Sequence, residues 1–211
     1  FPEGPATVAG FELLGASTPC QEVGGDYFTF LEREDGGCDV ILADVSGKGL
    51  PAALIVSDLH SGLHLLHRLD QPLDELARRL NRHLVEALLA NRFVTLFGAR
   101  LQPRQDTVEY LVAGHIPPFV IATDGAIRRL ETTGPVLGML ELPFAAGTTE
   151  LTPGELLLAF SDGYSEAEDE GELELGEAAV AEALAAWRHL PLEEIHTRLD
   201  AHVAAHRRGR P

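Results

Sequence analysis

The stretch CDVILADVSGKGLPAA, residues 38–53, sets a pattern that recurs along the chain. Residues 40–43 are apolar without alternation, which is typical of a strand buried on both faces. Asp44 follows this strand at once, and two glycines then allow a tight turn. Pro51 suits the first turn of a helix, so we predict a helix over residues 52–69. Asp44 is then either the cap of that helix or an acid held at the rim of the core.

A second acid stands in similar surroundings. A pair of glycines precedes Asp26, and residues 27–30 are rich in aromatic side chains, as in a strand. The sequence Asp-Gly-Gly at 35–37 has hairpin-turn chemistry and would pair this strand with the one that starts at residue 39. That pairing places Asp26 and Asp44 at the same edge of one sheet, provided that the register agrees.

A third acid ends another apolar run. Residues 156–160 are predicted to form a buried strand, and Asp162 follows in a Ser-Asp-Gly turn. Carboxylate oxygens without imidazole or thiolate select hard cations such as Mg²⁺ or Mn²⁺. A two-metal centre of this kind activates water for attack on phosphorus. The serines beside these acids and the cysteines have no visible base partner, which disfavours a serine or cysteine hydrolase. The candidate site is therefore Asp26, Asp44 and Asp162.

The rest of the chain alternates packing helices with short strands. A stripe of leucines at helical period predicts a helix over residues 72–88, and two more helices are predicted over 176–187 and 192–206. A strand is predicted near residues 148–152, and residues 1–15 are expected to be an entry linker or an edge strand. The strands predicted to form an antiparallel meander are residues 93–101, 107–113, 119–123 and 126–131.

Three histidines, His60, His64 and His67, fall on one face of the helix predicted over residues 52–69. A zinc site is one interpretation of this spacing, and polar histidines at the margin of an amphipathic helix are the other. We favour the second, because one helical face cannot supply a closed tetrahedron of ligands.

Composition limits the classes of function. The 211 residues suffice for one large domain, and 33 acidic against 16 basic residues give a formal net charge of −17. Such a surface repels phosphate backbones and anionic lipid, so we expect neither nucleic-acid binding nor membrane insertion. Cys20 and Cys38 form neither a disulfide framework nor a metal-site spacing, and a reducing, cytoplasmic location fits. The start at Phe1 suggests an excised domain.

Several segments, taken in order, resemble the motifs of bacterial metal-dependent Ser/Thr protein phosphatases of the PPM (protein phosphatase 2C-like) type, and more narrowly of their SpoIIE-like branch. These segments are EVGGDYF, ILADVSGKGLPAAL, FVTLF, AGHIPP, GPVLGML and LLLAFSDGYSEA, spread from about Gly15 to Ala167. The resemblance implies an α+β fold in which helices flank two antiparallel sheets, a four-layer α-β-β-α sandwich. It would form a single domain over residues 1–211.

The resemblance also implies roles for the acids. Asp26 would be a ligand of one metal ion, Asp44 would bridge two ions, and Asp162 would hold the second. The Val45 carbonyl would be a further ligand, at a place where many relatives have glycine. The implied cofactors are two Mn²⁺ or Mg²⁺ ions in the complete domain, and the implied reaction is hydrolysis of phosphoserine or phosphothreonine. Relatives act on antagonists of anti-sigma factors in bacterial partner-switching pathways, often behind an N-terminal sensor domain, and we expect such a phosphorylated partner here.

Two departures from the family pattern matter. Val112 stands where relatives often have asparagine, and a last strand with a DDxT-type acidic motif is not found, since Asp200 lies in a helical pattern. Three carboxylates balance only part of the charge of two divalent ions. We therefore expect one ion at best and slow turnover in this form, which calorimetry with Mn²⁺ on this chain and on a C-terminally extended one would test. An unpaired sheet position would also allow pairing between chains, and so a homodimer.

Two further residues keep two interpretations each. His115 and Lys48 are either a general acid or a contact for the substrate phosphate, or, respectively, a turn histidine and a solvated lysine. For the whole chain, the rival to an enzyme is a catalytically weak or silent PPM-fold signalling module that binds a regulatory partner. Hydrolysis of an aryl phosphate with and without Mn²⁺ separates the two.

Overall fold

The computed structural model describes residues 4–17, 24–88 and 91–207, so Cys20 lies outside the described residues. The strands are β1 (Ala6–Val8), β2 (Phe11–Leu13), β3 (Asp26–Glu32), β4 (Cys38–Val45), β5 (Val94–Leu101), β6 (Thr107–Ala113), β7 (Phe119–Ile121), β8 (Ile127–Arg129), β9 (Gly147–Glu150) and β10 (Leu156–Leu158). The helices are α1 (Leu50–His67), α2 (Leu73–Ala87), α3 (Asp162–Ser165), α4 (Glu177–Trp187) and α5 (Leu192–Arg207).

The larger sheet is built on the predicted hairpin. Its strand order is β3-β4-β5-β6-β9, and all neighbours are antiparallel. The turn between β3 and β4 closes through a bond from the Arg33 amide to the Gly37 carbonyl at 3.0 Å. Asp35 accepts a further bond from the Gly37 amide at 2.8 Å. The resulting register sets Asp26 directly opposite Asp44, so the predicted meeting of these strand ends is confirmed.

The predicted four-strand meander is wrong, because the chain changes sheets after its second strand. β5 and β6 belong to the larger sheet, whereas β7 and β8 join β10 in a three-stranded sheet of order β10-β7-β8. The change begins at Gly114, whose φ of 64° lies in the left-handed region. A Cβ at this residue would lie 2.3 Å from Val136 Cγ1, so the bend requires glycine. Two prolines without amide donors, at residues 117 and 118, then keep the segment out of the first sheet.

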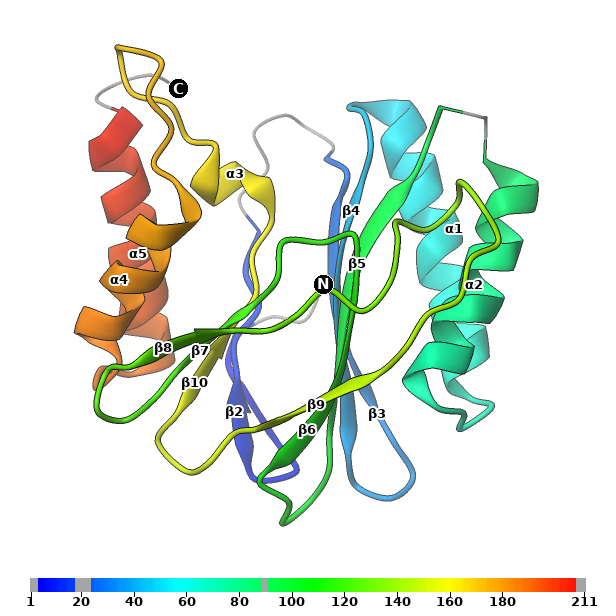
Figure 1. The fold of residues 1–211 in the computed structure, drawn as a ribbon, viewed down its shortest axis with the longest axis horizontal. Coiled ribbons are helices and arrows are strands. Elements are labelled where there is room, and N and C mark those ends of the chain that lie inside the picture. The colour runs from blue at the N-terminus through cyan, green and yellow to red at the C-terminus, as the bar shows by residue number, and fades with distance from the viewer. Residues whose placement is uncertain (1–3, 18–23, 89–90, 208–211) are drawn as a thin grey trace.

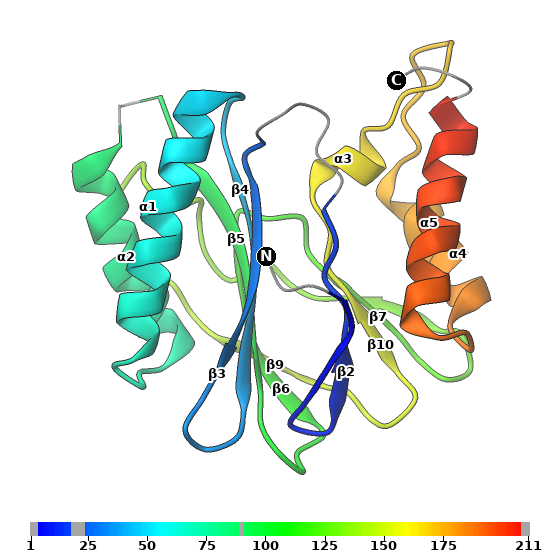
Figure 2. The same ribbon diagram turned by 180° about the vertical axis from the view of Figure 1, so that it is seen from behind.

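Helices cover the outer faces of the two sheets (Figures 1 and 2). Helices α1 and α2 pack on the five-stranded sheet through a core that includes Leu59, Leu63 and Leu80. Phe97, Val108 and Val120 belong to a second core, between the sheets. On the far side, α4 and α5 pack on the three-stranded sheet through a third core of residues from β7, α4 and α5. The α+β sandwich expected from the sequence is therefore confirmed.

Strand β10 is shorter and less buried than predicted. The strand expected over residues 156–160 spans only Leu156–Leu158, and its side chains are half-buried. Among the described residues β10 pairs with β7 alone, so its other edge is open. The strand lines a cleft of about 3190 Å³ that extends to β3 and β4 of the larger sheet. The strand is less buried than predicted because it lies at a sheet edge beside a cleft.

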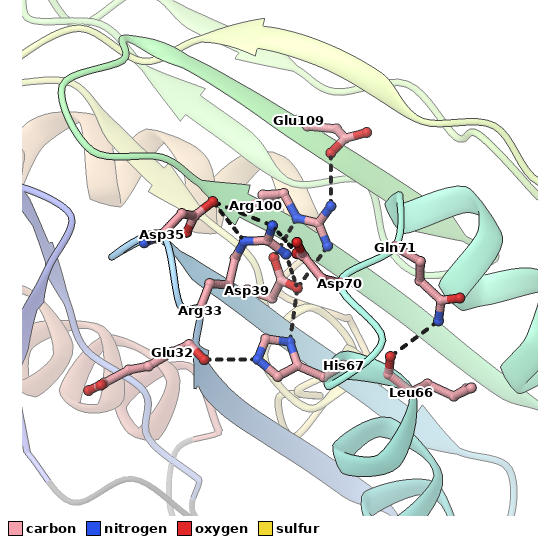
Figure 3. Close-up of polar contacts among 11 residues, drawn as sticks. Glu32, Arg33, Asp35, Asp39, Leu66, His67, Asp70, Gln71, Arg100 and Glu109 are labelled. Atoms are coloured by element: carbon pink, nitrogen blue, oxygen red, sulfur yellow. Dashed lines mark hydrogen bonds and ion pairs between the residues drawn. The ribbon is translucent and has the colours of Figure 1, made fainter.

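A buried ionic cluster joins α1 to the larger sheet (Figure 3). It lies near the start of β4, at the far end of this strand from Asp44. The Asp39 carboxylate is fully buried and accepts hydrogen bonds from Arg100 at 2.7 and 2.9 Å. Arg33 Nη1 lies 3.6 Å and His67 Nδ1 3.2 Å from the same carboxylate. His67 belongs to the last turn of α1, and its Nε2 also donates to the Glu32 carbonyl at 2.9 Å. The cluster therefore anchors the end of α1 to β3, β4 and β5.

No helix in the described part of the chain combines the length and the apolar character needed to cross a membrane.

Candidate active site

Two of the predicted acids meet at neighbouring strand ends. Asp26 begins β3 and Asp44 lies one residue before the end of β4, directly opposite it. The Val45 amide donates to the Gly25 carbonyl at 3.1 Å, which continues the pairing beyond Asp26. A Cβ on Gly25 would lie 2.5 Å from the Val45 carbonyl oxygen and 3.2 Å from Asp44 Oδ1. Glycine before Asp26 therefore lets the two strands approach at this carbonyl.

The third acid arrives from the other sheet. Asp162 opens the short helix α3, which follows β10 after residues 159–161. Its negative charge raises the pKa of both Asp26 and Asp44, so the three carboxylates lie close enough to repel one another. For Asp26, burial raises the pKa most, and a hydrogen bond from the Ser161 side chain opposes this effect. The fold thus gathers the three acids that the sequence predicted.

The Asp44 carboxyl has a strongly raised pKa. Burial is the main cause that raises its pKa to about 6, and the charges of Asp26 and Asp162 add to it. A bond from the Val45 amide acts in the opposite direction but does not compensate. Crowded, partly desolvated carboxylates of this kind are stabilised by a cation, which replaces the missing positive charge.

The turn after Asp44 settles how α1 begins. Gly47 and Gly49 have φ angles of 99° and 70°, and Gly49 is the N-cap of α1 without any side-chain cap bond. The interpretation of Asp44 as a helix cap is therefore wrong. Arg92 Nη1 donates to the Ser46 carbonyl at 2.6 Å, and the Phe93 amide donates to the Ser46 hydroxyl at 2.9 Å. These bonds hold the turn against the start of β5.

The family model described as "Stage II sporulation protein E (SpoIIE)" matches residues 34–211. The chain belongs to the SpoIIE family. The matched range contains Asp44 and Asp162, whereas Asp26 lies before it. The resemblance inferred from the motifs, to the SpoIIE-like branch of the PPM phosphatases, is confirmed.

Curated proteins with sequence similarity to this SpoIIE-family chain include two from Bacillus subtilis. Phosphoserine phosphatase RsbU is 31% identical over 160 residues, which are 74% of this chain and 48% of RsbU. Phosphoserine phosphatase RsbP is 27% identical over 149 residues, which are 67% of this chain and 36% of RsbP. The chain therefore spans about half or less of the length of these relatives.

Solved structures share the fold at lower identity. The SiaA-PP2C domain of Pseudomonas aeruginosa has a TM-score of 0.80 and 18% identity, covering 89% of this chain and 76% of that one. RsbX in complex with magnesium has a TM-score of 0.68 and 14% identity, covering 89% of this chain and 84% of that one. At these identities the likeness shows the fold of the SpoIIE-family domain.

One acid near the site was missed in the sequence. The pKa of Glu166 is raised, and the largest cause is the charge of Asp162, followed by burial and by Glu174 and Glu168. The charge of Glu166 also raises the pKa of Asp44. The available signal was the spacing, because Glu166 follows Asp162 by four residues, which is about one helical turn.

His115 is the other neighbour of the acids. It is 4% exposed, and its Nδ1 lies 2.9 Å from the Thr95 hydroxyl. Burial lowers its pKa to about 4, so the ring is neutral at neutral pH. The ring lines a cavity of about 310 Å³ together with Thr95, Asp44, Asp162 and Glu166. His115 lies at a bend after β6, as the interpretation of a turn histidine expects, but it is buried, whereas Lys48 is exposed on the glycine turn.

The acids fit a divalent cation by their chemistry. Oxygen donors alone, with an approachable backbone carbonyl at Val45, suit Mg²⁺ or Mn²⁺. Over residues 4–17, 24–88 and 91–207, however, no three His, Cys, Asp or Glu side chains form a group that could hold a metal ion. The donor set is therefore appropriate in type, and the carboxylates would have to draw together around an ion.

The histidine stripe on α1 is engaged in separate contacts. His60 Nδ1 lies 2.9 Å from the Tyr27 hydroxyl, whereas His67 contacts Asp39. The His64 ring is tilted against the His60 ring, with 4.2 Å between their centroids, and burial lowers the pKa of His64. These contacts favour the interpretation of polar histidines at a helix margin.

We expect the double variant His60→Gln, His64→Gln to keep divalent-cation binding and turnover within a few-fold of the unchanged chain. The reason is that neither ring belongs to the acid cluster, and glutamine preserves a polar group at each position. Calorimetric titration with Mn²⁺ and with Zn²⁺ measures this. A loss of bound metal in the double variant would restore the zinc interpretation.

Proposed function

We propose that this domain hydrolyses phosphoserine or phosphothreonine on a protein with the help of divalent cations. The observation that carries the proposal is the juxtaposition of Asp26 and Asp44 by strand register, with Asp162 brought beside them from the other sheet. Family membership supports it, because RsbU and RsbP are named phosphoserine phosphatases. We propose this activity for the site described above and not for a whole protein, since the chain spans only part of the length of those relatives.

The residues proposed to hold the cations are Asp26, Asp44, Asp162 and the carbonyl of Val45. A divalent cation, when bound, supplies positive charge that activates water and offsets the charge of the phosphoryl group. The chain itself contributes rigid strand ends that fix Asp26 and Asp44, and a helix start that presents Asp162. The named complex of RsbX with magnesium supports a divalent ion of this class. Comparison of turnover with Mg²⁺ and with Mn²⁺ determines which of the two ions the site uses better.

The proposed substrate is a phosphorylated antagonist of an anti-sigma factor, in a pathway of the kind in which relatives of this branch act. A phosphopeptide from such a partner, incubated with Mn²⁺, Mg²⁺ or a chelator, tests the activity directly. Release of phosphate only with a divalent ion is expected. If the folded domain releases no phosphate from phosphopeptide or aryl phosphate under any of these conditions, the silent signalling module is the better assignment.

Cation binding should depend on pH through the acids. The pKa of Asp44 is raised from 3.8 to about 6, so the folded protein binds this proton more tightly than the unfolded chain does. Without cation, the stability linked to Asp44 is complete below its unfolded pKa and is lost as the pH rises through 6. A cation replaces the proton, so Mg²⁺ should raise the melting temperature more at about pH 7.5 than at about pH 5.

Thermal unfolding at both pH values, with and without Mg²⁺, measures this effect. The variant Asp44→Asn serves as the control, because it cannot ionise and should lose most of the difference. Equal shifts of the melting temperature at the two pH values would contradict binding at this acid.

A further inference from the structure

The crossover between the sheets carries His115 into the interior. β6 ends at Ala113, and Gly114 bends the chain with a φ of 64°. The Gly114 amide donates to the Gly134 carbonyl at 3.0 Å, which fixes the bend. His115 follows immediately and is 4% exposed. Its place is therefore determined by backbone that has little freedom to shift.

The ring lies between the two backbone segments that carry the acids. On one side Nδ1 is 2.9 Å from Thr95 Oγ1, and Thr95 is the cross-strand partner of Asp44. On the other side the Phe160 backbone interacts with the ring and raises its pKa, and Phe160 precedes Asp162 by two residues. Thr95 belongs to the larger sheet, whereas Phe160 follows β10 of the smaller one. His115 thus spans the seam between the two sheets where the acids meet.

The second ring nitrogen has no established partner. His115 Nε2 is buried and makes no hydrogen bond of good geometry to any residue that the structure describes. A buried polar atom without a partner is destabilising, and a phenyl ring would remove this cost, although it would also remove the bond to the half-buried Thr95 hydroxyl. Packing alone therefore does not account for a histidine here. Nearby, the ring forms part of the wall of the 310 Å³ cavity that Asp44 and Asp162 also line.

We propose that His115 is a positioning residue, which links the Asp44 strand end through Thr95 to the Asp162 loop through the Phe160 backbone. On the loop side, the link is the interaction of the ring with the Phe160 backbone. The inference rests on the proposed function, since the acids it positions are those proposed to hold the cation. The burial that keeps the ring neutral supports a fixed link of this kind.

The experiment compares His115→Phe, Thr95→Val and the double variant. Thr133→Val is the matched control, because the Thr133 hydroxyl also bonds the backbone of the larger sheet, accepting from the Val112 amide at 2.9 Å, whereas the Thr95 hydroxyl bonds the His115 ring. Three measurements are made on each: the melting temperature without cation, the Mg²⁺ or Mn²⁺ affinity by calorimetry, and kcat and KM on a phosphopeptide.

For His115→Phe we expect an unchanged or higher melting temperature, with cation affinity and kcat lowered about 10–100-fold, as for supporting partners of metal ligands. KM should stay within a few-fold. The double variant should be no worse than the worse single one, because both remove the same link. His115→Gln, which keeps a donor near the Nε2 position, should recover part of the loss. The Thr133→Val control should lower the melting temperature without changing cation affinity.

A readout without cation separates the link from the activity. In Thr95→Val the backbone amide resonances of residues 160–163 should shift, because His115 joins Thr95 to that loop. Thr133→Val should leave them in place. If the unchanged chain binds no cation and hydrolyses nothing while these resonances shift, the proposed function fails and the link stands. If the unchanged chain is active while His115→Phe matches its affinity and kcat, the positioning role is overturned. Unmoved resonances overturn it as well.

Discussion

Replacing Asp44 with asparagine is expected to lower cation-dependent phosphatase turnover by more than about 100-fold, since even supporting partners of metal ligands are worth 10–100-fold. The fold should survive, because asparagine has nearly the same size and the neighbouring β4 residues Ile41, Ala43 and Val45 remain buried. Without cation at neutral pH, the melting temperature should rise. The variant removes a carboxylate whose charged form is disfavoured by burial and by Asp26 and Asp162.

Phosphopeptide hydrolysis with saturating Mn²⁺ and thermal unfolding without it measure the two effects. Asp58→Asn is a suitable control, because Asp58 is an acid on α1 that pairs with His83 at 3.0 Å, with 40% of its side chain exposed. It should leave both quantities nearly unchanged. Normal turnover of Asp44→Asn would show that Asp44 holds no essential cation.

Asp39→Ala is expected to destabilise the domain by about 3–5 kcal/mol, the cost of removing one partner from a buried ion pair. For a chain of this size the melting temperature should fall by roughly 6–20 °C. The reason is that Arg100, itself 6% exposed, loses the carboxylate that accepts two of its hydrogen bonds. Arg33 and His67 lose a contact at the same time.

Chemical denaturation of Asp39→Ala, compared with Glu194→Ala, measures this loss. Glu194 pairs with Arg198 at 2.7 Å, but both side chains are about half exposed, so its removal should cost no more than about 1 kcal/mol. Similar effects of the two substitutions would mean that water already replaces the Asp39 pairing.

The hairpin and its acids could be predicted because the information is local. The Asp-Gly-Gly turn fixes the register of β3 against β4, and register alone sets Asp26 opposite Asp44. The sheet to which β7 belongs could not be predicted in the same way. Three apolar residues pair equally well with either sheet, and the choice follows from the bend at Gly114, whose need for glycine comes from Val136.

Glu166 beside the acids and the ionic cluster at the other end of β4 were harder to predict than the acids themselves. Glu166 looks like part of an acidic surface until Asp162 is placed one helical turn away. The Asp39 cluster draws on residues from β4, β5, α1 and the turn after β3, so no single stretch of sequence contains it. A local hint was a charged residue near one end of each of two mostly apolar strands, Asp39 in β4 and Arg100 in β5.

The order of the strands has a consequence for how the chain can be divided. The larger sheet takes β3 to β6 and then β9, while the smaller one takes β7, β8 and β10, so the two layers are interleaved along the sequence. Arg128 of β8 also donates to the Thr149 hydroxyl and the Glu150 carbonyl of β9, across the seam. Cleavage of the chain at any one point therefore cannot yield two fragments that each contain one of these sheets complete. Unfolding should be a single cooperative event that disperses the acids together. Folding should be slow, because the pairings of β4 with β5, β6 with β9 and β7 with β10 join segments that are distant in sequence.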